Sequence, residues 1–182
     1  MEQIQGFFPK ALRRTLAAVS ILAVLLSVSA CKKQSGSETV PTENTAPPTV
    51  LTVNGATVKP GDRNVEVTVE ISGNPGILGM DFDLYYDDTV MTLTNAVSAI
   101  DVPDAVYTPP AYYRTPTTFL WEFPDAGWDA DGTVLTLSFD ILETAATGEY
   151  EIKIMYDYGN VFDVGCEPIN IKVTNAYITI ES

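Results

Sequence analysis

The sequence predicts an all-β domain, a sandwich or barrel of antiparallel strands, over residues 49–182. Short runs of β-branched and aromatic residues alternate with polar residues at a period of two, and clusters of Gly, Pro, Asn and Asp separate these runs. No convincing helical pattern occurs in this region. Such alternation between regularly spaced turn residues is typical of antiparallel sandwiches and barrels, and the length is typical of a single domain.

Nine strands are predicted in chain order. They span residues 50–53, 64–72, 79–86, 90–98, 106–113, 118–123, 133–142, 149–156 and 169–180. Burial of one apolar face by each strand, at about 25 cal/mol per Å² of apolar area, supplies a core without disulfides or a metal.

Two of these strands show which side chains face the core, because successive side chains of a strand point to opposite sides of the sheet. In residues 79–86 the side predicted to be buried holds Met80, Phe82, Leu84 and Tyr86, and the outward side holds Asp81, Asp83 and Tyr85. In residues 149–156 the buried side holds Tyr150, Ile152, Ile154 and Tyr156, and the outward side holds Glu149, Glu151, Lys153 and Met155. Both strands therefore present an acidic outer surface.

Residues 1–30 have the features of a secretory signal. Basic residues occur before Leu16, an almost uninterrupted apolar run extends to Val28, and small residues precede Cys31. This order is typical of a cleavable signal peptide. The apolar run of about a dozen residues is shorter than the roughly 20 that a permanent membrane-spanning helix needs.

The tetrapeptide Val-Ser-Ala-Cys at residues 28–31 resembles a lipobox, the signal at which bacteria attach a diacylglycerol to the cysteine sulfur and cleave before it. That resemblance implies that Cys31 becomes the lipidated N-terminus, and Cys166 then has no partner within the chain. The alternative is ordinary cleavage after Ala30, which leaves a Cys31 thiol able to pair with Cys166. Residues 31–48, rich in Ser, Thr and Pro, are predicted to be a flexible tether between the membrane and the domain.

Charge restricts the possible partners. Residues 31–182 carry seven basic and 23 acidic residues, a net charge of −16. Such a surface repels nucleic acid and anionic lipid headgroups, so no nucleic-acid partner is expected. The charge is compatible with a basic protein partner, with calcium, or with neutral ligands such as sugars.

The sequence also lacks the residues of most catalytic sites, and we predict that the protein is not an enzyme. It contains no histidine, which excludes histidine-based general base catalysis and histidine metal sites. Gly-x-Ser-x-Gly, phosphate-binding and Cys-x-x-Cys motifs do not occur either. Carboxylates are so abundant that a pair of them has little diagnostic value for glycoside hydrolysis.

The segment from Asp125 to Gly132 resembles a calcium-binding loop only superficially. With Gly132 at the sixth position, Gly127 stands at the first and Ser138 at the twelfth, so the leading Asp and the bidentate Glu are missing. The segment is predicted to be an acidic turn, with incidental weak calcium binding as the alternative. No resident cofactor or metal is expected.

Aromatic residues cluster in the middle of the chain, at Tyr107, Tyr112, Tyr113, Trp121 and Trp128. Three roles remain open for them: packing in the core or loops, anchoring a protein interface, and stacking on sugar rings. Alternation of Phe119, Trp121 and Phe123 favours the core, whereas the large area that Tyr and Trp bury at small entropic cost suits an interface.

Six segments, taken in order, resemble the cohesin domain family. The first three are PGDRNVEVTVEI from Pro60, GNPGILGMDFDLYYDD from Gly73 and VMTL from Val90. The others are GTVLTLSFDI from Gly132, NVFD from Asn160 and INIKVTNAYITI from Ile169. Together they cover nearly all of residues 50–182 in the order and spacing of the family.

The resemblance implies a nine-stranded antiparallel sandwich with jelly-roll topology, within the carbohydrate-binding-domain-like superfamily. Cohesins bind dockerins, which are paired calcium-loop modules on the enzymes of cellulosomes, so calcium would be carried by the partner. In the family the dockerin lies on one sheet face formed by the third, fifth, sixth and eighth strands. On this chain the corresponding face would hold Asp81, Asp83 and Tyr85 on the third, Tyr112 on the fifth, Glu122 on the sixth, and Glu151 and Lys153 on the eighth.

Three functional hypotheses follow from these observations. The first is a lipid-anchored, extracytoplasmic receptor on the cell surface that binds dockerin-bearing enzymes or scaffold proteins of a polysaccharide-degrading complex. The second is a carbohydrate-binding lipoprotein that captures polysaccharide at the cell surface. The third is a structural envelope protein that shares the fold and lacks the binding.

Overall fold

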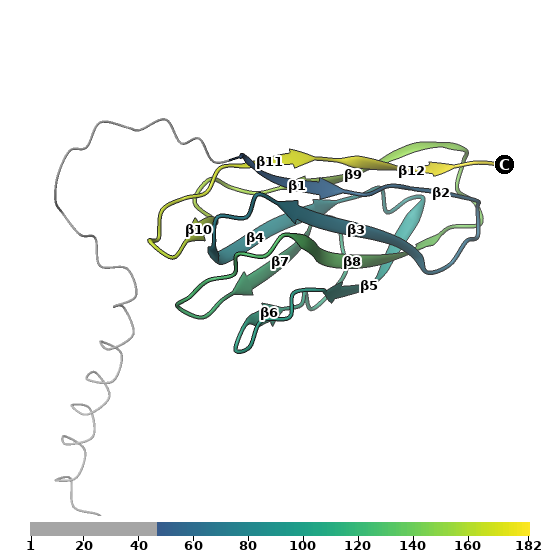
Figure 1. Cartoon of the computed structure of the whole chain (residues 1–182). Coiled ribbons are helices and arrows are strands. Elements are labelled where there is room, and N and C mark those ends of the chain that lie inside the picture. Colours follow the sequence, from purple (N-terminus) through teal and green to yellow (C-terminus); the bar gives the residue numbers. More distant parts are fainter. Residues whose placement is uncertain (1–46) are drawn as a thin grey trace, which may run out of the picture. The chain divides into compact units, whose positions relative to one another are not determined.

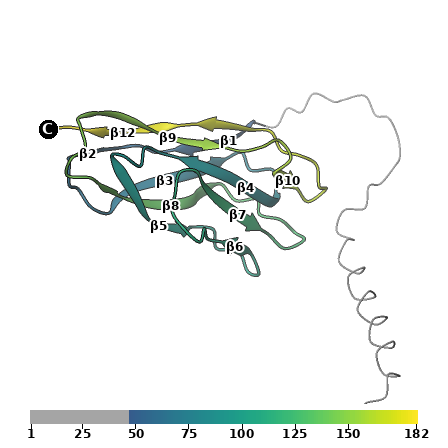
Figure 2. The same cartoon turned by 180° about the vertical axis from the view of Figure 1, so that it is seen from behind.

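Two β-sheets packed against each other make up the part of the chain that the computed structural model describes, residues 47–182 (Figure 1). Turning the molecule by 180° shows the same two layers from behind (Figure 2). The prediction of an all-β fold is therefore confirmed. No helix long and apolar enough to cross a membrane is present within residues 47–182.

The first sheet has five strands, in the order β11, β1, β3, β8, β5. Their bounds are Ile171–Thr174 for β11, Thr49–Val53 for β1, Val65–Ser72 for β3, Gly132–Ile141 for β8 and Met91–Ser98 for β5. All neighbours are antiparallel except β1 and β11, which run parallel.

The second sheet follows the order β2, β12, β9, β4, β7, β6, with β10 paired to β4 beside this path. The bounds are Ala56–Val58 for β2, Ala176–Ile180 for β12, Gly148–Met155 for β9, Ile77–Tyr85 for β4, Thr117–Glu122 for β7, Val106–Thr108 for β6 and Val161–Asp163 for β10. Here β2 and β12 are the parallel pair.

The described residues form twelve strands where nine were predicted, and the difference has two causes. The chain changes sheets between β1 and β2 and again between β11 and β12, so the single strand predicted over 169–180 is two strands. The crossing chains approach closely, since a Cβ on Gly55 would lie 2.3 Å from the carbonyl oxygen of Tyr177. The three-residue strands β2 and β10 were not predicted, because they are too short to show a period.

The core lies between the sheets and confirms the predicted sidedness of the strands. The inward side of β4 is buried, with Met80, Phe82 and Leu84 at most 2% exposed. In β9, Ile152 and Ile154 are buried, while Tyr150 and the residue directly after the strand, Tyr156, are half-buried against the core. The Phe82 ring contacts Trp121, with 5.3 Å between ring centroids. Burial of these alternate residues holds the other side of β4 and β9 outward.

Candidate partner-binding face

The outward side of the second sheet is an acidic surface built by β4, β7 and β9. Asp83 of β4 lies between Met155 of β9 and Thr118 of β7, and Tyr85 lies opposite Lys153. Side chains that are directly opposite on neighbouring strands share a face. We call this surface the binding face.

Six of the seven predicted partner-binding residues lie on it. They are Asp81, Asp83 and Tyr85 on β4, Glu122 on β7, and Glu151 and Lys153 on β9. Glu122 is opposite Gly79 of β4 and Val106 of β6, so the face extends to the edge of the sheet. The predicted third, fifth, sixth and eighth strands are indeed neighbours in one sheet, as β4, β6, β7 and β9.

Tyr112 does not lie on a strand, and its predicted place on the fifth strand was wrong. The strand β6 ends at Thr108, directly before Pro109 and Pro110. Proline has no backbone N–H to donate to a neighbouring strand, which explains why the strand stops there. Tyr112 is 76% exposed in the following loop, where the Arg114 guanidinium lies 5.6 Å from the centre of its ring.

Neutral side chains hold three carboxylates of the binding face. The Asn160 Nδ2 donates to Asp81 Oδ1 at 2.7 Å, and Thr118 Oγ1 donates to Asp83 Oδ1 at 2.5 Å. Asn175 Nδ2 donates to Glu151 Oε1 at 3.2 Å. These donors orient the carboxylates and leave their negative charge in place.

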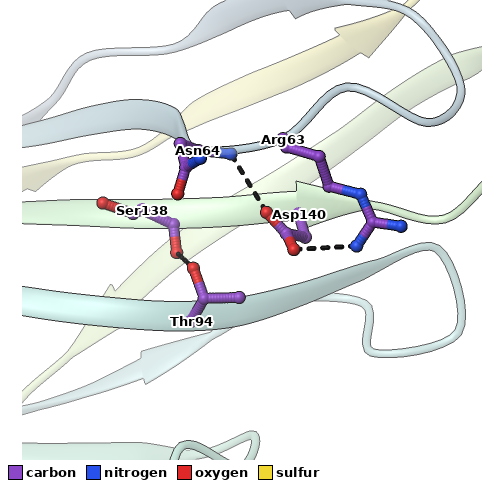
Figure 3. Close-up of polar contacts among 5 residues, drawn as sticks. All are labelled: Arg63, Asn64, Thr94, Ser138 and Asp140. Atoms are coloured by element: carbon purple, nitrogen blue, oxygen red, sulfur yellow. Dashed lines mark hydrogen bonds and ion pairs between the residues drawn. The ribbon is translucent and has the colours of Figure 1, made fainter.

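The single ion pair among the described residues joins Arg63 to Asp140 and lies at the first sheet, away from the binding face. Arg63 Nη1 is 2.8 Å from Asp140 Oδ2, and the Asn64 backbone N–H donates to Asp140 Oδ1 at 3.0 Å (Figure 3). These contacts, the Asn64 hydrogen bond first, lower the pKa of Asp140 below its ordinary value. On β4, β7 and β9 the single basic residue is Lys153, so the binding face stays acidic.

Exposed apolar side chains accompany the carboxylates. Met155 of β9 is 46% exposed, Tyr177 of β12 is 50% exposed and Val106 of β6 is 52% exposed. An interface with apolar contacts inside a polar rim is typical of protein–protein recognition. The alternation of β9 placed Met155 outward, whereas Val106 and Tyr177 gave no signal without the strand order.

Two hollows open beside Tyr85. One of about 200 Å³ is lined by Asp81, Asp83, Tyr85, Met155, Tyr156, Asp157 and Asn160. The other, of about 400 Å³, is lined by Tyr85, Tyr86, Asp87, Thr115, Glu149, Tyr150, Glu151 and Lys153. The binding face is therefore not flat, and its two hollows are large enough to accept side chains of another protein.

Most of the central aromatic residues pack inside the protein. Trp121 is 1% exposed, and its indole Nε1 donates to Ser98 Oγ at 3.0 Å. Tyr107 stacks on Trp121 at 5.0 Å between centroids, and burial raises the pKa of Tyr107 to about 12. Trp128 stacks on Phe123 at 5.5 Å. Core packing is confirmed for both tryptophans.

Residues 125–131 connect β7 to β8, as predicted for an acidic turn, and Gly132 is the first residue of β8. Asp131 Oδ1 accepts a hydrogen bond from the Asn74 backbone N–H at 2.9 Å, and this bond lowers the pKa of Asp131. Its carboxylate thus fixes the neighbouring loop. Within residues 47–182 no three acidic or cysteine side chains gather as a metal site would require.

Cys166 lies in the turn after β10. Its backbone N–H donates to the Asp163 carbonyl at 2.9 Å. The other cysteine of the sequence, Cys31, lies outside the described residues, as do the predicted signal peptide and most of the tether.

Known proteins resemble the described domain in sequence and in fold. The family model described as a cohesin domain matches residues 49–180. The chain is similar to a non-cellulosomal cohesin from the archaeon Archaeoglobus fulgidus, with a TM-score of 0.62 and 13% identity over 75% of this chain and 93% of that chain. No curated protein matches the sequence.

Two further similar structures contain a cohesin in complex with a dockerin. One is a type I cohesin–dockerin complex from Clostridium thermocellum, Coh-OlpA-Doc918, with a TM-score of 0.62 and 17% identity over 74% of this chain and 100% of that chain. The other is the sixth cohesin of Acetivibrio cellulolyticus scaffoldin B with the Cel5 dockerin, with a TM-score of 0.62 and 22% identity over 74% and 100% of the two chains. At these identities the likeness shows the fold, a jelly-roll sandwich.

Proposed function

The chain belongs to the cohesin family, and we propose that its domain is a non-catalytic receptor for a dockerin-bearing enzyme or scaffold protein. The family match over residues 49–180 carries this proposal. Similar folds solved with a bound dockerin support it. The partner would then belong to a polysaccharide-degrading complex of the cellulosome type.

The binding face supplies the means of recognition. Carboxylates at Asp81, Asp83 and Glu151 attract a partner that offers Lys or Arg, and Tyr85 and Met155 offer apolar contact between them. Electrostatic complementarity of this kind speeds association and selects among partners. Tyr112 is a separate exposed contact candidate in the loop before β7.

We further propose that the receptor is displayed outside the cytoplasm, on the cell surface. The support is the signal-like segment of residues 1–30 and the lipobox-like tetrapeptide that ends at Cys31. A lipid thioether at Cys31 and a disulfide between Cys31 and Cys166 exclude each other, because both use the same sulfur. The intact mass of the protein from a bacterial membrane, before and after reduction, distinguishes them: a diacylglycerol adduct supports the anchor, and a gain of two hydrogens on reduction supports the disulfide.

Calorimetric titration tests dockerin recognition. The full chain, purified in detergent, is titrated with dockerin modules from the same genome, with and without calcium. Calcium-dependent binding that Asp81→Ala weakens supports the proposal. Absence of binding to every dockerin contradicts it. Binding to a panel of polysaccharides instead would favour the carbohydrate-binding alternative.

A further inference from the structure

The turn that connects β9 and β10 brings Asn160 to the binding face. The alternation pattern of the sequence does not place this side chain there. On one edge of β4, β9 pairs with Asp83–Tyr85 and β10 pairs with the stretch from Ile77 to Met80. Asp81 lies in the gap between these two pairings. The chain crosses this gap in residues 156–160 and arrives beside Asp81 at Asn160.

Asn160 holds Asp81 at two points. Its side-chain Nδ2 donates to Asp81 Oδ1 at 2.7 Å, and its backbone carbonyl accepts a hydrogen bond from the Asp81 N–H at 3.1 Å. The turn itself is closed by a bond of 3.0 Å from the Asn160 N–H to the Asp157 carbonyl. Both backbone groups of Asn160, its N–H and its carbonyl, are therefore hydrogen-bonded, and these bonds fix the position from which its side-chain amide reaches Asp81.

The hydrogen bond from Asn160 constrains the carboxylate without neutralising it. An amide carries no charge, whereas a Lys or Arg in its place would both orient Asp81 and cancel its charge. With Oδ1 occupied, Asp81 Oδ2 has no hydrogen-bond donor within residues 47–182. Asp81 and Asn160 both line the hollow of about 200 Å³ on the binding face.

We infer that Asn160 is a positioning residue of the binding face, which fixes the Asp81 carboxylate so that Oδ2 meets a hydrogen-bond donor of the protein partner. This inference rests on the proposed function, because Asn160 acts through a residue of the same face. Without the amide, the Asp81 side chain is free to rotate, and the partner must order it on binding. The cost of ordering one such side chain raises the dissociation constant by about three- to tenfold.

A double-mutant cycle tests this role in the full chain, titrated with a dockerin module that binds the wild-type protein. We expect Asn160→Ala to weaken binding about three- to tenfold. Asp81→Ala, which removes a hydrogen bond to a charged group, should weaken it about 10- to 100-fold. In the Asp81→Ala background the Asn160 substitution should add nothing, since there is no carboxylate left to position.

Asn54→Ala is the matched control. Asn54 also donates an exposed side-chain amide to an oxygen on a neighbouring strand, Thr68 Oγ1 at 2.9 Å, and it lies beside the first sheet. Its loss should leave the affinity unchanged. Thermal unfolding of each variant, with and without dockerin, separates loss of binding from loss of the fold.

The outcomes separate this inference from the proposed function. If the wild-type chain binds dockerin and Asp81→Ala weakens binding, but Asn160→Ala binds like the wild type, the inference is overturned and the proposed function stands. An equal loss from Asn160→Ala in both backgrounds also overturns it, because the effect then does not pass through Asp81. If no dockerin binds the wild-type chain, the proposed function fails and the inference fails with it.

Discussion

The ring of Phe162 covers Gly79 on the outward side of the second sheet. A Cβ on Gly79 would lie 2.4 Å from Cζ of this ring, and the two residues are opposite each other on β10 and β4. Glu122 is opposite Gly79 on the other side. The absence of a side chain at one position of β4 thus allows an aromatic ring to close one end of the binding face.

Substitution of Gly79 and of Gly55, two glycines on which a Cβ would be crowded, should have unequal effects on stability. In Gly79→Ala the half-buried Phe162 ring can rotate away, so we expect a loss of about 1–3 kcal/mol in the free energy of unfolding. In Gly55→Ala the Cβ would meet the backbone carbonyl of Tyr177, which cannot move without separating the crossing strands. Urea denaturation should therefore show the larger loss for Gly55→Ala, and equal losses would contradict this explanation.

Stability should depend on pH through Asp140. Its pKa is lowered in the folded state by the Asn64 N–H and by Arg63, so the folded state binds this proton less readily than the unfolded chain does. The stabilisation is present above the unfolded pKa of about 3.9 and is lost as pH falls through the lower folded pKa. The difference in melting temperature between the wild type and Asp140→Asn should thus shrink from pH 7 towards pH 2.

Asp125→Asn is the control for that comparison. Asp125 is exposed in the connection between β7 and β8, with no hydrogen bond to its carboxylate among the described residues. The melting temperature of the Asp125→Asn variant should equal that of the wild type at every pH. A gap between wild type and Asp140→Asn that stays constant down to pH 2 would show that the charge of Asp140 does not contribute.

Trp121 and Tyr112 should differ sharply when they are replaced. Trp121→Ala removes a fully buried ring and its hydrogen bond to Ser98, so the free energy of unfolding should fall by about 3–5 kcal/mol. Tyr112→Ala changes a side chain that is 76% exposed and should stay within about 0.5 kcal/mol of the wild type. Chemical denaturation checks both, and a large loss for Tyr112→Ala would mean that its loop packs against the domain.

Charge reversal on the binding face should weaken dockerin binding. Glu122→Lys places a cation among the carboxylates, and we expect the dissociation constant to rise about tenfold at low salt. The effect should diminish as added salt screens exposed charges. Titrations at several ionic strengths provide the measurement.

Glu66→Lys is the matched control for the charge reversal. Glu66 is exposed on β3 of the first sheet, opposite Ser138 of β8, and the substitution changes the net charge of the chain by the same amount. Its affinity should stay within about twofold of the wild type. Equal losses for both variants would indicate that net charge rather than the binding face determines affinity.

Much of the binding face was predictable from one strand at a time. The alternation in residues 79–86 and 149–156 placed Asp81, Asp83 and Glu151 outward, and the buried residues between them confirm that placement. The same local method failed where no period exists. It extended the fifth strand past Pro109 to Tyr113, although β6 ends at Thr108.

The sequence by itself determined which side of each long strand faces the core, because burial of alternate side chains is a local property of a strand. The tertiary structure decided which strands are neighbours, where the chain changes sheets, and that Asn160 meets Asp81 from 79 residues away. Strand neighbours depend on how all strands together satisfy their backbone hydrogen bonds and bury their apolar faces. The pattern within a single strand does not contain this information about the other strands. The contact of Asn160 with Asp81 could therefore be found only from the tertiary structure.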